Sequence, residues 1–379
     1  MIINIMCGIM DHDNGRMDNA VHGNRLPTDI RNILLIQLGD IGDVVLSLPA
    51  IMALRSHFSK SRLVVCVREK AKGLLEDTRE VNDILSVNKK KRLLLEEIEY
   101  QIQFFSKLRK YRFDLAIDLR TGTRGTVIAL LSGSRYRVGR LDDGPQTWRK
   151  AFFTQLVKPD PSIELNQYAS EHHLNILASI GITAQDRIPN LRVTVEKRRR
   201  ILGMLAKEGV PMDKPMVVLH PFSLWPYKEW RHERWVRLID DLTGTHLLSV
   251  LVTGSAGERR RASEMLRPFR RNVFNLAGKT DIGELPALIE ACRLFVGVDS
   301  SVLHIAGAVG VPTVAIFGPS SPVTWAPRKK RHVSVSKEMP CIPCRQKGCR
   351  GNGISRCLDE LSYEEVKKAI DAQLESLSP

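Results

Sequence analysis

The sequence predicts an α/β protein built from two doubly wound halves. Short apolar runs, typical of buried parallel strands, alternate with helical stretches over residues 30–140 and again from residue 215 onward. Most of the strands end in loops rich in Gly, Ser, Thr or Asp. A chain of 379 residues, 43% of them hydrophobic, is long enough for two domains that each have a core.

The composition argues against membrane-spanning and secreted proteins. No apolar run reaches the roughly 18–20 residues that a membrane-spanning helix needs. The N-terminus has neither a basic region before its apolar part nor a small-residue cleavage pattern, so we expect no secretory signal. Residues 1–28 lack periodicity and are rich in Gly, Asn and Asp after Met10, which predicts a flexible extension.

The charge is strongly basic, with a formal net charge of +15. Such a charge favours anionic partners, such as phospholipid, phosphorylated glycolipid or nucleic acid. The aromatic content of 6% and the lack of a base-stacking motif favour a lipid or sugar phosphate, and we expect no nucleic-acid partner. The basic residues form runs at 89–92, 197–200, 259–261, 270–271 and 328–331.

The first half of the chain contains five predicted strands. We place them at residues 31–37, 62–67, 84–87, 113–119 and 136–139, with helices at 44–56, from 71, 93–111 and 126–131. The loop 38–43 has two glycines before a helix but lacks G-x-G-x-x-G, so it does not indicate a dinucleotide site. Asp43 opens the helix 44–56 in this interpretation, either as an N-cap or as a general base facing a cleft.

The end of the fourth strand carries two arginines, Arg120 and Arg124. They are equally well explained as ligands of an anionic acceptor and as surface residues. Residues 141–165 are predicted to be irregular, 171–180 to be helical and 186–195 to cross between the halves. The paired histidines His172 and His173 could orient an acceptor, but we favour a position on the helix surface.

The second half repeats the alternation. Strands are predicted at 215–220, 247–253, 273–276, 294–298 and 312–317, with helices at 196–208, 230–242, 282–291 and 302–309. Three loops, 220–228, 253–258 and 297–301, follow parallel strands and therefore lie on one edge of the sheet. They present Ser223, Lys228 and Glu258, and together they indicate a nucleotide ligand.

The third of these loops is Asp299-Ser300-Ser301, at the start of the helix 302–309. A helix N-terminus with neighbouring hydroxyls suits a phosphate, and Asp299 can accept hydrogen bonds from sugar hydroxyls. His304 lies one turn into the helix, on the side of Ser301. The alternative is that Asp299 is only a cap and His304 only a core residue.

Four of the seven cysteines fall close together near the C-terminus. Cys341, Cys344, Cys349 and Cys357 have the pattern C-x2-C-x4-C-x7-C. Four thiols at this spacing could form a structural zinc site, the only metal that the sequence suggests. We favour the alternative of reduced thiols, or an adventitious disulfide, in a packed loop.

Residues 31–370 resemble glycosyltransferase family nine, the lipopolysaccharide heptosyltransferases. The resemblance rests on IQLGDIGDVVLSLPA at 36–50, HPFS at 220–223 with KEW at 228–230, and VDSSVLHIA at 298–306 with FGP at 317–319. It implies a GT-B fold, in which two Rossmann-like domains face each other across a cleft. It also implies an acceptor-binding domain at 29–195 and a donor-binding domain at 196–379.

The resemblance implies roles for the matching residues. Asp43 corresponds to the catalytic base, Lys228 and Ser223 to the groups that hold the donor phosphates, and Glu258 to the nucleoside-binding carboxylate. Asp299 corresponds to the contact with the donor sugar, Ser300 and Ser301 to a phosphate-binding loop, and His304 to its neighbour.

The implied activity is metal-independent transfer of heptose from ADP-heptose, with inversion, to a phosphorylated lipid A–Kdo type acceptor. No cofactor is implied, and the enzyme would work at the cytoplasmic face of the inner membrane, held there peripherally by its basic patches. The alternatives are a GT-B enzyme acting on another nucleotide sugar, as transferase or epimerase, and a basic, non-enzymatic binding module.

Overall fold

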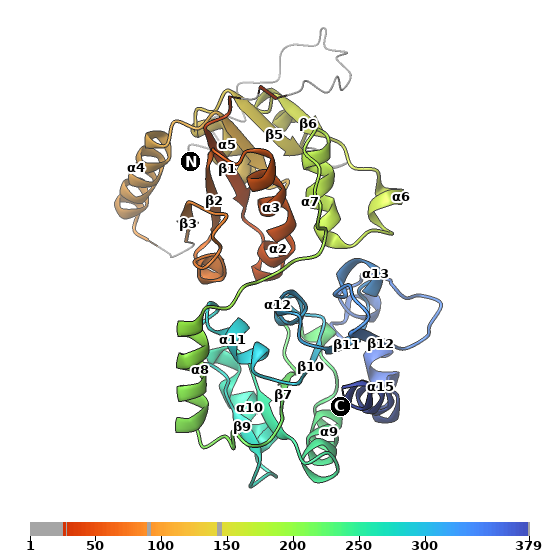
Figure 1. Cartoon of the computed structure of the whole chain (residues 1–379). Coiled ribbons are helices and arrows are strands. Elements are labelled where there is room, and N and C mark those ends of the chain that lie inside the picture. The colour runs from red at the N-terminus through yellow and green to blue at the C-terminus, as the bar shows by residue number, and fades with distance from the viewer. Residues whose placement is uncertain (1–25, 28, 89–91, 142–145, 378–379) are drawn as a thin grey trace.

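The computed structural model describes residues 26–27, 29–88, 92–141 and 146–377. The predicted N-terminal extension lies almost entirely outside these residues. Two six-stranded parallel sheets form the two bodies that Figure 1 shows one above the other. The two predicted doubly wound halves are therefore confirmed, and the boundary proposed at residue 195 falls between the last strand of one sheet and the first of the other.

The first sheet has the strand order β3-β2-β1-β4-β5-β6. This order is the doubly wound arrangement, in which the order of the strands reverses between the parallel neighbours β1 and β4. The strands are fully buried near the centre because helices cover both faces. Their bounds are β1 Asn32–Gln37, β2 Arg62–Arg68, β3 Asp83–Val87, β4 Leu115–Asp118, β5 Tyr136–Arg140 and β6 Gln155–Val157.

Among the described residues, eight helical segments accompany the first sheet. They are α2 Ile41–Leu46, α3 Leu48–His57, η1 Glu69–Leu74, α4 Leu94–Lys110, α5 Thr123–Leu131, η2 Gln146–Ala151, α6 Pro161–Glu164 and α7 Ala169–Ala178. The single helix predicted over 44–56 is wrong, because the chain breaks at Ser47 between α2 and α3. Pro49 has no N–H to continue α2 and instead occupies the first turn of α3.

The second sheet repeats the topology of the first. Its order, β12-β11-β10-β7-β8-β9, places the reversal between β7 and β10. Its strands are β7 Met216–His220, β8 Ser249–Val252, β9 Val273–Asn275, β10 Leu294–Val298, β11 Thr313–Phe317 and β12 His332–Ser336. Its helical segments are α8 Val195–Lys207, η3 Pro226–Lys228, α9 His232–Gly244, η4 Ala256–Glu258, α10 Arg259–Leu266, α11 Leu285–Glu290, α12 Ser301–Val309, α13 Pro322–Trp325, η5 Cys349–Gly351, α14 Arg356–Glu360 and α15 Tyr363–Ser376.

Other regions also differ from the sequence prediction. The segment 141–165 is not irregular: it contains η2, β6 and α6. Strand β12 and the C-terminal helix α15 were not predicted at all. Helix α15 packs on β11, β12 and α9, with Val366 and Ile370 buried in the core of the second domain.

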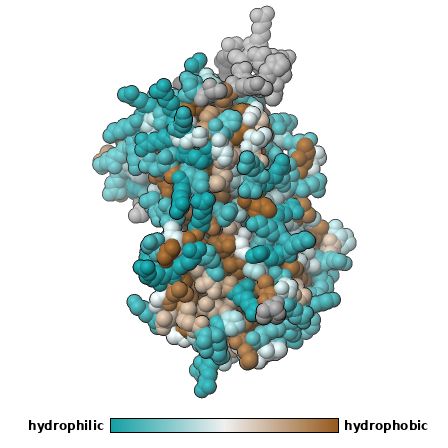
Figure 2. Space-filling model, viewed as in Figure 1, coloured by the Kyte–Doolittle hydropathy of each residue, from teal (hydrophilic) through white to brown (hydrophobic). Residues whose placement is uncertain are grey.

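The two domains meet through helices α2 and α12, which begin at the facing edges of the two sheets. The crossing segment also touches the second domain, because the N–H of Leu191 donates to the carbonyl of Ala308 at 3.0 Å. The face shown in Figure 2 is largely hydrophilic, with hydrophobic residues scattered over it. Because α2 and α12 begin at these edges and pack against each other, the point where the strand order reverses in each sheet opens toward the junction between the domains.

Candidate active site

The site lies between the carboxyl ends of the two sheets. Ligands of doubly wound sheets bind at the point where the strand order reverses, and here two such points face each other. A cavity of about 530 Å³ joins them, a size that accommodates a nucleotide sugar. The cavity brings together the predicted catalytic and donor-site residues Asp43, Ser223, Lys228, Glu258, Asp299, Ser300, Ser301 and His304.

Asp43 belongs to the first turn of α2 and faces this cavity. It does not open the helix as predicted: Asp40 is the N-cap, and the Asp43 carboxylate accepts the N–H of Asp40 at 2.8 Å. A second contact comes from Arg120, whose guanidinium lies 2.8 Å from the same carboxylate oxygen. Gly39 makes room for this arrangement, because a Cβ there would lie 2.3 Å from Asp43 Oδ2.

Arg120 is held in place by a buried ion pair. The backbone N–H of Arg120 donates to Asp118 Oδ1 at 3.1 Å, and the Asp118 carboxylate pairs with the Arg149 guanidinium at 3.0 Å. Arg149 also donates to the carbonyls of Arg120 at 3.0 Å and Arg140 at 2.8 Å. Burial raises the pKa of Asp118, and the charge of Arg149 opposes that rise. The pair thus fixes the backbone of two arginines that face the site.

The loop before Asp43 is supported by a buried histidine. His173 of α7 lies 3.2 Å from the side-chain amide of Gln37 and 3.3 Å from the carbonyl of Leu46. Gln37 in turn accepts the N–H of Gly39 at 3.1 Å. Burial lowers the pKa of His173 to about 4, so the ring is neutral at physiological pH. The predicted helix-surface position of His173 is therefore wrong.

On the opposite side of the cavity, Lys228 and Asp299 form an ion pair of 2.6 Å. Asp299 follows β10 and is 5% exposed, whereas Lys228 ends η3 after β7. The pair therefore bridges the reversal point of the second sheet. Since the lysine is the less buried partner of the pair, it can turn toward a bound anion while its stem stays in place.

Helix α12 points its N-terminus into the cavity. Ser300 is the N-cap, but its hydroxyl makes no capping bond and has no hydrogen-bond partner among the described residues. His304 is buried, with the Nδ1 atom also unpartnered there, and its ring lies 6.1 Å from that of Trp325. Burial lowers the pKa of His304, and the charge of Asp299 opposes this effect. Free polar atoms beside a helix N-terminus suit an anionic ligand.

Glu258 and Ser223 lie farther along the same rim. Glu258 Oε2 accepts hydrogen bonds from the backbone N–H of Ser255 at 2.6 Å and from the Ser255 hydroxyl at 2.9 Å. The other carboxylate oxygen, Oε1, is left for a ligand. The N–H of Ser223 donates to Glu229 at 3.0 Å, so this loop is fixed by a residue outside the cavity. Both residues line the 530 Å³ cavity.

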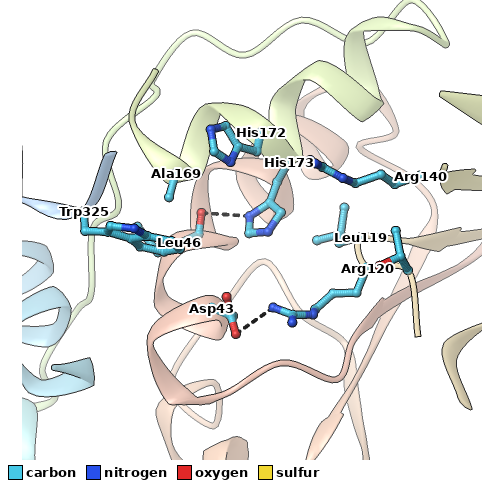
Figure 3. A pocket seen from close by; sticks show the side chains of 10 residues that line it. Asp43, Leu46, Leu119, Arg120, Arg140, Ala169, His172, His173 and Trp325 are labelled. Atoms are coloured by element: carbon cyan, nitrogen blue, oxygen red, sulfur yellow. Dashed lines mark hydrogen bonds and ion pairs between the residues drawn. The ribbon is translucent and has the colours of Figure 1, made fainter. Parts of the chain in front are cut away.

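Two smaller cavities adjoin Asp43 and Arg120. One of about 220 Å³ is lined by both residues together with His172, Arg140 and Trp325, and Figure 3 shows the Arg120 side chain directed at Asp43. Arg140 is bound to Glu164 through two contacts of 2.6 and 2.7 Å. The other cavity, of about 370 Å³, contains Arg120 and Arg124. Of the two predicted acceptor residues, only Arg120 thus reaches Asp43.

Sequence reasoning missed several residues of the site. Trp325 lines both the 220 Å³ and the 530 Å³ cavities, and Lys70 lines the larger of the two. A further cavity of about 540 Å³, also lined by Trp325, includes Arg345 and Gln346, from the cysteine-rich loop, beside Lys228. The N–H of Arg345 donates to the carbonyl of Pro319 at 2.8 Å, which ties this loop to the end of β11. No motif in the sequence indicates that the cysteine-rich loop lies beside Lys228.

The four clustered cysteines, for which zinc was the less favoured interpretation, do not form a metal site in this geometry. No three of the sulfur atoms of Cys341, Cys344, Cys349 and Cys357 lie within 4.8 Å of one another. All four are free thiols. In the part of the chain that the structure covers, the only group with such spacing is Asp241, His246 and Asp371, and Lys367 already pairs with both aspartates at 2.9 and 2.8 Å.

The sequence model of glycosyltransferase family 9 (heptosyltransferase) matches residues 101–354. The chain belongs to glycosyltransferase family 9. The family resemblance of the sequence motifs is therefore confirmed, and the chain is an enzyme rather than a non-enzymatic binding module. Together with the two facing sheets, membership identifies the architecture as the predicted GT-B fold.

Curated relatives and solved structures agree with this assignment. Lipopolysaccharide heptosyltransferase 3 of Escherichia coli is 26% identical over 76% of this chain and 83% of its own length. Lipopolysaccharide heptosyltransferase 2 of E. coli K12 is 24% identical over 90% and 98%.

Among solved structures, a family 9 glycosyltransferase from Veillonella parvula superposes with a TM-score of 0.78 at 21% identity, covering 93% of this chain and 99% of its own. The E. coli ADP-heptose LPS heptosyltransferase II superposes with a TM-score of 0.73 at 22% identity, covering 91% and 99%. These structures are similar in fold to this family 9 glycosyltransferase.

Proposed function

We propose that this glycosyltransferase transfers heptose from ADP-heptose to the lipopolysaccharide inner core, with inversion at the anomeric carbon. The observation that carries the proposal is that Asp43 and the Lys228–Asp299 pair face the same cavity from opposite domains. A base on one side and an anion-binding group on the other match a direct displacement, in which the hydroxyl attacks as the diphosphate leaves.

The second domain supplies the donor site in this proposal. Lys228 and the N-terminus of α12 stabilise the negative charge that develops on the leaving diphosphate. The unpartnered hydroxyl of Ser300 is available to donate to a phosphate oxygen. Glu258 binds hydroxyls of the nucleoside, and Asp299 binds hydroxyls of the transferred sugar.

The first domain supplies the base. Asp43 accepts the proton of the attacking acceptor hydroxyl while the new glycosidic bond forms. Its two contacts, with Arg120 and with the N–H of Asp40, both reach the same oxygen, Oδ2. The other oxygen, Oδ1, is therefore open to the acceptor.

We propose that the reaction needs no metal ion. The two acidic residues nearest the reacting atoms already have cationic partners, since Asp43 pairs with Arg120 and Asp299 with Lys228. Lys228 and the helix N-terminus provide positive charge where a metal would otherwise neutralise a diphosphate.

The choice of donor and acceptor rests on the relatives. Both curated relatives are named lipopolysaccharide heptosyltransferases, and one of the solved structures is that of an ADP-heptose LPS heptosyltransferase. We propose a phosphorylated lipid A–Kdo type acceptor, reached at the cytoplasmic face of the inner membrane. The net charge of +15 favours such an acceptor, and no helix in the described part of the chain is long and apolar enough to span a membrane.

The test is release of ADP from ADP-heptose, with and without an acceptor that lacks heptose. We expect release that depends on the acceptor, and we expect UDP-sugars and other ADP-sugars to give none. Release from a different nucleotide sugar would replace the proposed donor. Conversion of the sugar nucleotide without acceptor would instead indicate an epimerase, the alternative that the fold leaves open.

A further inference from the structure

Helix α4 carries an unusual number of exposed aliphatic side chains. Leu94, Leu95 and Ile102 are 75%, 80% and 64% exposed. Leu93 and Ile98 are exposed as well, and the five residues are called the α4 apolar surface below. Leu94, Ile98 and Ile102 follow one another at four-residue spacing and so form one line along the helix. Phe104 and Leu108 hold a different side of α4 against the first domain.

This surface lies beside the proposed acceptor site. Helix α4 follows β3, and the strands of the sheet are parallel, so its N-terminus is at the same edge as Asp43. Val87, at the end of β3, lines the 370 Å³ cavity with Arg68, Arg120 and Arg124. Helix α4 also packs on α5, which carries Arg124. Figure 1 shows α4 at the outer side of the first domain, with no element beyond it.

The charges around the surface indicate an anionic partner. Arg68, Arg120 and Arg124 lie in the adjoining cavity, and Lys107, Arg109 and Lys110 end the helix. The basic run at residues 89–92 directly precedes Leu93 in the sequence.

The three acids of α4 are engaged locally. Glu96 accepts the N–H of Leu93 at 3.1 Å, Glu97 pairs with Arg92 at 3.1 Å, and Glu99 accepts from Gln103 at 2.8 Å. Exposed aliphatic residues beside such cations are typical of helices that lie in the surface of an anionic bilayer.

We propose that the α4 apolar surface docks the enzyme on an anionic lipid bilayer. The leucines and isoleucines enter the headgroup region, while the neighbouring arginines and lysines attract the phosphates. Docking at this edge places an acceptor anchored in the same bilayer next to Arg124 and Arg120, and through Arg120 next to Asp43. The use of docking for catalysis rests on the proposed function, but docking itself does not.

The experiment measures binding of the full chain to vesicles by co-sedimentation. Vesicles of phosphatidylcholine mixed with phosphatidylglycerol are compared with vesicles of phosphatidylcholine alone. The test variant is Leu94→Gln/Leu95→Gln/Ile102→Gln, which keeps residues that favour helices. The matched control is Val195→Gln/Leu202→Gln/Leu247→Gln, which removes three exposed aliphatic residues, two from α8 and one from the segment before β8.

We expect the wild type and the control to bind the anionic vesicles, and the α4 variant to bind them at least about tenfold more weakly. Salt should weaken the binding of all three proteins. Equal binding by the α4 variant and the wild type would overturn the proposal, as would absence of binding by the wild type. A wild-type dimer that the α4 variant disrupts, without vesicle binding, would assign the surface to a second copy instead.

A transfer assay separates this inference from the proposed function. With an acceptor embedded in vesicles, the α4 variant should be slower than the wild type; with a soluble acceptor that lacks acyl chains, the two should be equal. No transfer to either acceptor by any of the proteins would contradict the proposed function and leave the vesicle result standing. Equal rates on embedded acceptor would contradict the role of docking in catalysis.

Discussion

The Asp43 carboxylate and the Arg120 guanidinium lie 2.8 Å apart where β1 and β4, the two strands at the first reversal point, end. This contact joins a loop after residue 37 to one after residue 118. It directs one carboxylate oxygen toward the arginine and leaves the other facing the cavity. The Asp43 carboxylate is thus fixed by two contacts, one with Arg120 and one with the N–H of Asp40 at the start of α2.

Asp43→Asn should abolish most of the transfer activity. The amide cannot take the acceptor proton, and loss of general base catalysis typically costs about 10²–10⁴-fold in rate. Asp40→Asn is the matched control, because asparagine also caps helices and this acid lies in the same loop. Rates of ADP release measure both variants, with ADP binding as the check on folding. Equal losses in the two variants would show that the loop, not the base, is what Asp43→Asn disturbs.

Gly39→Ala should reduce kcat by at least about tenfold, because a Cβ at this position would lie 2.3 Å from Asp43 Oδ2 and must displace the carboxylate. Gly122→Ala is the control. That glycine also precedes a helix at the same edge of the sheet, but no atom lies within 4 Å of an added Cβ. Steady-state kinetics on both variants decide the matter, and unchanged kcat in Gly39→Ala would contradict a fixed position for Asp43.

Lys228→Met should weaken ADP binding and lower kcat together. The lysine is proposed to neutralise the diphosphate, and loss of one such group typically costs about 10²–10³-fold in kcat. The substitution also removes the ion-pair partner of the Asp299 carboxylate, a residue that is only 5% exposed. Titration calorimetry with ADP and transfer kinetics test both effects. Lys72→Met, at an exposed lysine that pairs with Glu76, should change neither.

Arg149→Met should destabilise the protein by about 3–5 kcal/mol, because it leaves the fully buried carboxylate of Asp118 without a counter-charge. The double variant Asp118→Asn/Arg149→Met should recover part of that loss, since no buried charge remains. Urea unfolding of the two variants gives the comparison. If the double variant is the less stable of the two, the cost comes from lost hydrogen bonds to Arg120 and Arg140 rather than from the charge.

His173 should make stability depend on pH. Its pKa is about 4 in the folded protein and near 6.5 when unfolded, so between these values the unfolded chain binds more protons. Stability should therefore fall as the pH drops through this window, by up to about 3 kcal/mol from this group alone. Urea unfolding at neutral pH and near about pH 5 should show a smaller drop in His173→Gln than in the wild type. An equal drop would contradict the assignment, and His57→Gln, at an exposed histidine, provides the control.

The local features of the site were readable from the sequence because they depend on neighbouring residues. Alternating apolar runs specified the central strands of both sheets, and the loops after them carried Asp43, Lys228, Glu258 and Asp299. All four residues line the predicted cleft. The break at Ser47 and the strand β12 were missed, since an apolar helix and an edge strand of mixed polarity lack a clear period.

Only the tertiary structure decided which segments that are distant in the sequence come into contact. The pairing of Gln37 with His173 and of Asp118 with Arg149, and the position of Arg345 beside Lys228, depend on how helices and loops pack after the sheets have formed. Sequence periodicity records which face of an element is buried, but not which element covers it. The sequence by itself therefore determined the family, the fold and the cavity residues that lie in strand-end motifs, whereas packing added Trp325 and Lys70 to the cavity and determined which side chains hold those residues in place.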